Sequence, residues 1–158
     1  MAPRYGRVET TLSSGVFGGN MDRVETREGS TVYLPVWTSG ACLIFGDIHA
    51  VQGNGELNGT ALEVTGEVTL RIEVLKGRKS EWPRLEDEPH IMVAGNARPL
   101  MDCVRLAMIG LLDWLVEDYG FQREEAWQLM AQVTTFRIGN VVDPKYTVVA
   151  KFPKQYLP

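Results

Sequence analysis

The sequence is poor in cysteine and histidine, with two residues of each among 158. Two thiols are too few for a disulfide framework or a four-thiolate zinc site. Long apolar runs are also missing, because Asp113 interrupts the best candidate, residues 106–116, which is shorter than the roughly 18 residues that a membrane span requires. The first residues carry no apolar core of the kind found in a secretory signal. We therefore expect a cytoplasmic protein.

Basic residues are also scarce relative to acidic ones, 16 against 20, which gives a net charge of −4 at pH 7. A nucleic-acid or anionic-membrane partner selects for a basic face, so neither partner is expected. The chain is 44% hydrophobic and 23% charged, as is usual for a globular protein. Its length suits one domain with its own core, and we assign residues 1–158 to a single domain.

The first half of the chain has the composition and periodicity of β structure. Residues 30–37 are rich in β-branched and aromatic side chains, and residues 41–50 form a mostly apolar run that suggests a strand buried on both faces. Residues 67–75 alternate between apolar and polar side chains, which predicts a half-buried strand. We expect these strands to form a sandwich-like sheet.

The second half changes to a helical period. Apolar residues recur at three- and four-residue steps between Pro99 and Gly120, and a second helical segment follows at 123–133. This predicts a helical hairpin at about 98–134. Two short β-prone runs come after it, separated by the turn at Asp143 and Pro144. Strands, then a helical hairpin, then strands indicate the α+β class.

The stretch GDIHAVQGNGE, residues 46–56, is the first candidate site. In an extended chain Asp47 and His49 project from the same side, and zinc accepts imidazole nitrogen and carboxylate oxygen together. Glu56 returns after a glycine-rich turn and could act as a third ligand or a general base. The alternative is structural: His49 hydrogen-bonds Asp47 at a strand end, and Glu56 is a solvated hairpin residue.

The stretch FGGNMD, residues 17–22, is the second candidate site. Two glycines before Asn20 suggest a tight backbone path, and the side chains of Asn20 and Asp22 could orient a substrate amide through hydrogen bonds. An Asx-turn in which Asp22 caps a loop is the alternative interpretation.

These motifs, in this order, resemble the C-terminal part of the acetamidase/formamidase family. The matching segments include FGGNMD, TVYLPVW, GDIHAVQGNGELNGTALEV, IMVAGNARPL and NVVDPKYTVVAKFPKQYL, and they cover nearly the whole chain. The resemblance implies an amidase that hydrolyses formamide or acetamide to carboxylate and ammonia with a divalent metal, and zinc is the metal we expect. The family usually has aspartate at Asn54 and commonly glycine at Ile48.

The resemblance implies that the residues at the matching motif positions are site residues. These are Asp47, His49 and Glu56, together with Asn20 and Asp22. We expect Asp47 and His49 to bind the metal and to activate a water molecule. Glu56 is expected to take the proton of that water. The metal, or the side chain of Asn20 or Gln52, would stabilise the tetrahedral oxyanion. Asn20, Asp22 and Gln52 form the expected substrate-binding set.

The resemblance covers only the C-terminal half of the family pattern. A chain without the other half would expose sheet edge and apolar surface, so we expect a homo-oligomer or a separately encoded partner that supplies the N-terminal half. The alternative function is a catalytically inactive half-domain that serves as an assembly or small-molecule binding partner.

Overall fold

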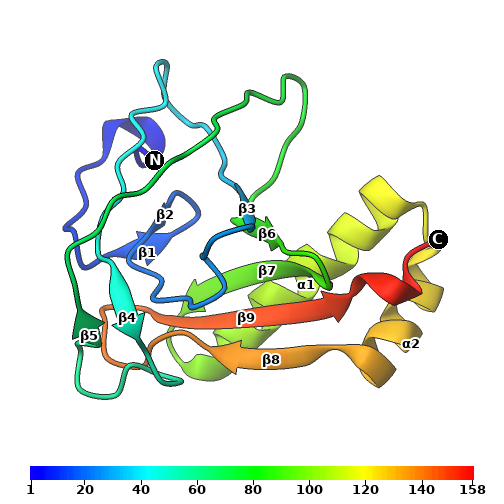
Figure 1. Cartoon of the computed structure of the whole chain (residues 1–158). Helices are drawn as coiled ribbons and strands as arrows, with labels where there is room; N and C mark the ends of the chain where they lie inside the picture. Colours follow the sequence, from blue (N-terminus) through cyan, green and yellow to red (C-terminus); the bar gives the residue numbers. More distant parts are fainter.

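A computed structural model describes residues 1–158. Its main sheet has five antiparallel strands in the order β3-β6-β7-β9-β8. The strands β7 and β9 pair along their whole length, from His90 opposite Pro153 to Ala97 opposite Tyr146 (Figure 1). In chain order the strands of this sheet are β3 (Thr31–Tyr33), β6 (Arg84–Glu86), β7 (His90–Ala97), β8 (Thr135–Ile138) and β9 (Tyr146–Pro153).

Two helices, α1 (Leu100–Tyr119) and α2 (Arg123–Val133), pack behind this sheet (Figure 1). The first helix begins after Pro99 and ends at Gly120, whose φ of 73° is the left-handed conformation that terminates helices. Leu111 and Leu115 are fully buried, and each contributes roughly 1.5–3 kcal/mol of hydrophobic stabilisation. The predicted helical hairpin and the α+β class are both confirmed.

The strand β7 is buried on both faces. Ile91 and Val93 face the helices, whereas Met92 and Ala94 join a second apolar cluster with Met21. This second cluster fixes the segment that leads into Asp22. The other face of the sheet therefore anchors one of the two candidate site segments.

The remaining strands are short and lie outside the main sheet. They form two separate two-stranded pieces, β1 with β2 and β4 with β5. Two single-turn 3-10 helices lie near the two ends of the chain, at Arg4–Gly6 and Lys154–Tyr156. The four strands are β1 (Ser14–Gly15), β2 (Gly18–Gly19), β4 (His49–Val51) and β5 (Leu62–Glu63).

Two of the long strands expected from the sequence are not formed, and the first-half strands are not gathered into one sandwich-like sheet. Of residues 41–50 only His49 and Ala50 lie in a strand, and Ile44 is 84% exposed. Residues 67–75 lie outside every strand, and Ile72 is 68% exposed. A strand forms only where a neighbouring backbone completes the hydrogen-bond ladder, and outside His49 and Ala50 these segments have no strand partner. No helix has the length and apolar character needed to cross a membrane.

Candidate active site

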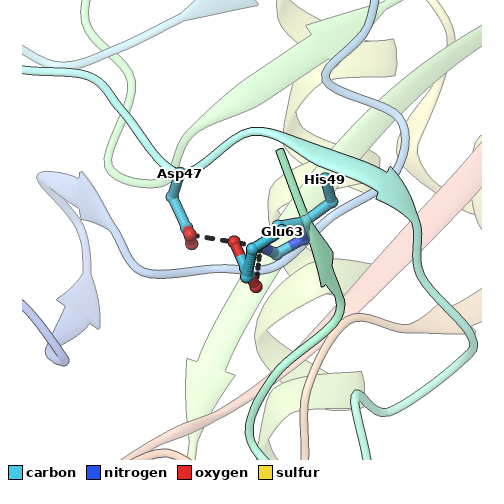
Figure 2. Close-up of side chains that lie close together, drawn as sticks. All are labelled: Asp47, His49 and Glu63. Atoms are coloured by element: carbon cyan, nitrogen blue, oxygen red, sulfur yellow. Dashed lines mark ion pairs between the residues drawn. The ribbon is translucent and has the colours of Figure 1, made fainter. Parts of the chain in front are cut away.

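The β4–β5 hairpin brings three titratable side chains together. His49 and Glu63 are direct cross-strand partners, which places their side chains on one face of the hairpin. Nε2 of His49 lies 3.1 Å from Oε1 of Glu63 and 3.2 Å from Oδ1 of Asp47. Figure 2 shows the three side chains converging from β4, β5 and the loop before β4. We call Asp47, His49 and Glu63 the carboxylate–imidazole cluster.

The imidazole of His49 is largely buried and is held from its other side by Gln52. Its Nδ1 atom lies 2.9 Å from Oε1 of Gln52. Burial alone would lower the pKa of His49. The hydrogen bond to Gln52 and the charges of Asp47 and Glu63 outweigh burial and raise the pKa above its usual value.

A second group of acidic side chains lies beside the first. One carboxylate oxygen from each of Asp22, Glu56 and Asp143 falls within 4.8 Å of the other two, and we call these residues the carboxyl cluster. Side-chain amides cross-link it: Asn20 donates to Asp143 over 2.8 Å, and Asn140 donates to Asp22 over 2.9 Å. The cluster thus joins segments from opposite ends of the chain.

The electrostatics of the carboxyl cluster favour bound protons. Burial, followed by a hydrogen bond to Asp143 and the charge of Glu56, raises the pKa of Asp22 to about 8. Burial also raises the pKa of Glu56, although His49 and Asp22 partly oppose this shift. At neutral pH the carboxyl group of Asp22 therefore carries a proton that it can donate.

Glu56 connects the two clusters into one site. Its Oε1 atom lies 3.9 Å from Nε2 of His49, and its side chain is only 6% exposed. An open hollow of about 510 Å³ adjoins this point, lined in part by Gln52, Asn54 and Glu56. Its volume falls within the range of small-molecule sites, roughly 300–1,000 Å³.

The backbone is strained at three carboxylate residues of the site. Asp22, Asp47 and Glu56 have φ values of 48°, 68° and 43°, in the left-handed region that non-glycine residues seldom adopt. Such conformations cost of the order of 1–3 kcal/mol each and concentrate at functional sites. The same conformation occurs at Tyr5, Ala41 and Cys42 outside the site, so the strain includes the three motif carboxylates but is not confined to them.

Comparison with known proteins agrees with these motifs. The sequence profile of the Acetamidase/Formamidase family matches residues 7–156. The chain belongs to this family. The α+β fold is shared with solved acetamidases: that of Yersinia enterocolitica is 44% identical, with a TM-score of 0.92 over 94% of this chain. The acetamidase of Bacillus halodurans is 32% identical, with a TM-score of 0.87 over 92% of this chain.

The chain matches only part of each of its relatives. It covers 45% of the Yersinia enterocolitica chain and 50% of the Bacillus halodurans chain. The acetamidase of Mycolicibacterium smegmatis is 39% identical over 84 residues, which are 52% of this chain and 20% of that protein. The chain therefore spans at most about half the length of these relatives.

The carboxylate–imidazole cluster fits a divalent cation. Nε2 of His49 is buried without a hydrogen-bond partner and faces the oxygens of Asp47 and Glu63. One imidazole nitrogen and two carboxylate oxygens form a ligand set that zinc accepts. A bound cation would also neutralise the negative charge that gathers at this point.

The structure brings the predicted site residues together and adds three that the sequence patterns did not single out. Asn20, Asp22, Asp47, His49, Gln52 and Glu56 all lie in the two clusters or bridge them. Glu63, Asp143 and Asn140 are the additions. Pairing residues 49–51 with 62–63 as a hairpin would have revealed Glu63. From the sequence, Asp143 is identified only as part of a turn before Pro144. No local sequence pattern identifies Asn140 as a site residue.

Proposed function

We propose that this chain contributes the hydrolytic site of an amidase that converts formamide or acetamide to the carboxylate and ammonia. The observation that carries the proposal is the convergence of both family motifs on one site. Glu56 of the second motif lies 3.9 Å from the imidazole of His49 and shares the carboxyl cluster with Asp22 of the first motif. Family membership and the names of the solved relatives support the reaction class. The chain covers only part of those relatives, so the activity of the whole protein belongs to this proposal.

Asp47, His49 and Glu63 would hold the divalent metal, with zinc the best match to this ligand set. When bound, such an ion lowers the pKa of a water molecule toward neutrality and polarises the carbonyl oxygen of the substrate. The protein contributes two fixed carboxylates and one imidazole, each positioned by the β4–β5 hairpin or the loop before it.

Glu56 is placed to accept a proton as the water oxygen bonds to the amide carbon. Its raised pKa makes it a stronger base than an exposed glutamate. The tetrahedral intermediate collapses by breaking the C–N bond, and the leaving nitrogen needs one proton. Asp22, which holds a proton at neutral pH, or the newly protonated Glu56 can supply it. Ammonia then leaves, and the carboxylic acid passes its remaining proton to the deprotonated site carboxylate or to solvent, which gives the carboxylate product.

Asn20 would orient the substrate amide. Its Nδ2 donates to Asp143 and more weakly to Asp22, so its Oδ1 is the group available to accept an N–H of the substrate. Asp143 gains a positioning role through the same contact. A pocket for formyl or acetyl groups needs only a small volume beside Glu56.

We also propose that the chain works within an assembly, either a homo-oligomer or a complex with a separate chain that supplies the family's other half. Apolar side chains on residues 43–45 and 68–75 are exposed: Ile44 by 84%, Ile72 by 68% and Val74 by 75%. Exposed apolar side chains, when they gather into a patch, mark interaction sites. The same surface also supports the alternative function, a non-catalytic half-domain that only assembles or binds.

The experiment that separates these functions measures ammonia release from formamide and acetamide together with the metal content of the purified chain. About one zinc per chain with turnover supports the amidase. Metal without turnover points to a missing partner half, which can be tested by adding the N-terminal half of a solved acetamidase. Absence of both metal and turnover, even with that half added, would leave the non-catalytic function.

A further inference from the structure

Gln52 uses every hydrogen of its side-chain amide on protein partners. Its Nε2 donates to the backbone carbonyl of Asp22 over 2.5 Å and to that of Gly139 over 3.3 Å. Its Oε1 lies 2.9 Å from Nδ1 of His49. The side chain therefore bridges the backbone beside the carboxyl cluster and the imidazole of the other cluster.

These partners fix which end of the amide faces His49. Backbone carbonyls only accept hydrogen bonds, so the NH₂ group of Gln52 has to point at Asp22 and Gly139. The oxygen is then the end that meets the imidazole. Because Oε1 cannot donate, Nδ1 of His49 has to carry the hydrogen of this bond.

We infer that Gln52 is a positioning residue, which holds neutral His49 as the Nδ1–H tautomer and leaves the lone pair of Nε2 facing Asp47 and Glu63. Without Gln52 the opposite tautomer would be favoured. Carboxylate oxygens of Glu63, Asp47 and Glu56 lie 3.1, 3.2 and 3.9 Å from Nε2, and each would attract a hydrogen placed there. A hydrogen on Nε2 would occupy the lone pair through which the imidazole would bind a metal. The tautomer is a property of the metal-free protein, whereas its use in catalysis depends on the proposed amidase function.

A glycine makes this arrangement sterically possible. A Cβ atom at position 139 would lie 2.5 Å from the carbonyl oxygen of Met21, so only glycine allows these two backbones to approach so closely. Their approach brings the carbonyls of Asp22 and Gly139 within reach of one amide group. Gln52 is thus held by two segments that are distant in the sequence.

This role replaces the oxyanion contact expected for Gln52 from the sequence. Stabilising an oxyanion requires a donor, and both hydrogens of the amide are already engaged with carbonyls. The remaining acceptor capacity of Oε1 cannot serve a negatively charged oxygen. The side chain therefore acts on the reaction through His49 and does not touch the substrate.

The test combines imidazole ¹⁵N NMR with zinc affinity. In metal-free protein at alkaline pH, where the ring is neutral, His49 should show a protonated Nδ1 and an unprotonated Nε2. A His90→Gln variant assigns the signals, because the chain has only two histidines. Gln52→Met should move the proton to Nε2 and weaken zinc binding by roughly 10–100-fold, as measured by chelator competition. Gln132→Met, on the exposed side of α2, is the matched control and should change neither.

Gln52→Glu tests the mechanism further, because it keeps an acceptor for Nδ1 but has no hydrogen for the carbonyls of Asp22 and Gly139. An Nδ1–H signature in this variant would support the inference that the acceptor facing Nδ1 sets the tautomer. The inference is overturned if the wild-type protein carries its proton on Nε2, or if Gln52→Met leaves the tautomer unchanged. The wild-type spectrum decides the question even if the variants fold poorly. An Nδ1–H signature that moves in Gln52→Met, in a protein that binds no zinc, would support the role of Gln52 and refute the proposed metal site instead.

Discussion

Glu63 faces His49 across the β4–β5 hairpin, with Oε1 of the carboxylate 3.1 Å from Nε2 of the imidazole. The hairpin register decides this contact, because a slip of one residue would turn Glu63 to the opposite face. Asp47 reaches the same imidazole from the chain that enters the hairpin. A single hairpin and its entrance thus supply the whole proposed metal-binding set.

Replacing Glu63 should weaken this site. Glu63→Gln keeps the size of the side chain but removes its charge, and we expect zinc affinity to fall by at least about 10-fold. Chelator competition measures the loss. Glu67→Gln, an exposed glutamate in the same segment, is the control and should bind zinc like the wild type. Unchanged affinity in Glu63→Gln would remove Glu63 from the ligand set.

Removing the proposed general base should separate metal binding from chemistry. Glu56→Gln is expected to lower turnover of formamide or acetamide by roughly 10²–10⁴-fold, the usual contribution of a positioned base. Zinc should stay bound, since Glu56 lies 3.9 Å from the imidazole nitrogen and outside the three-residue set. Turnover close to that of the wild type, with metal still present, would show that another group accepts the proton.

Asp22 should make the stability of the protein depend on pH. Its pKa is about 8 in the folded chain against an ordinary value of 3.8, so folding increases its affinity for the proton. A group of this kind contributes most to stability when both states are protonated, and its contribution is lost as the pH rises from about 4 to about 8. The free energy of unfolding of the wild type, relative to Asp22→Asn, should therefore decrease across this range. Urea denaturation at several pH values measures the difference, and a difference that rises with pH contradicts the assignment.

The exposed apolar segment at 68–75 should govern assembly. A lysine at Ile72 places a charge on a side chain that is 68% exposed in the single chain, so the fold should survive while association weakens. Size-exclusion chromatography with light scattering should show a shift toward monomer for Ile72→Lys. Thr69→Lys adds the same charge between the apolar positions and should leave the assembly in place. A wild-type chain that is already monomeric would refute the proposed assembly.

The helical hairpin could be predicted because its information is local. Pro99 and Gly120 bound the first helix, and the apolar spacing between them gives the face that packs on the sheet. The strands expected at 41–50 and 67–75 could not be judged in this way, because a strand needs a partner as well as a pattern. Their side chains have β-sheet periodicity, but apart from His49 and Ala50 in β4 these residues have no strand partner within this chain.

The candidate site was predictable in part for a similar reason. Asp47, His49, Gln52 and Glu56 lie within one short motif, so their proximity follows from the sequence. Asp143 reaches Asn20 across a separation of 123 positions, and Asn140 reaches Asp22 across 118. The packing of Met21 against β7 and β9 and the close approach of Gly139 to Met21 bring these segments together, and no local pattern specifies those contacts.

This difference in separation also sets an order of events when the chain folds. The carboxylate–imidazole cluster can form as soon as one hairpin closes, whereas the carboxyl cluster has to wait until residues 140–143 dock beside residues 20–22, since contacts between distant segments form more slowly. Gln52 also gains its two carbonyl partners only at that later stage. Refolding in the presence of zinc should therefore pass through a weak metal complex that tightens before amide turnover appears. Acquisition of the metal and acquisition of activity would then be two separate steps in the maturation of one protein.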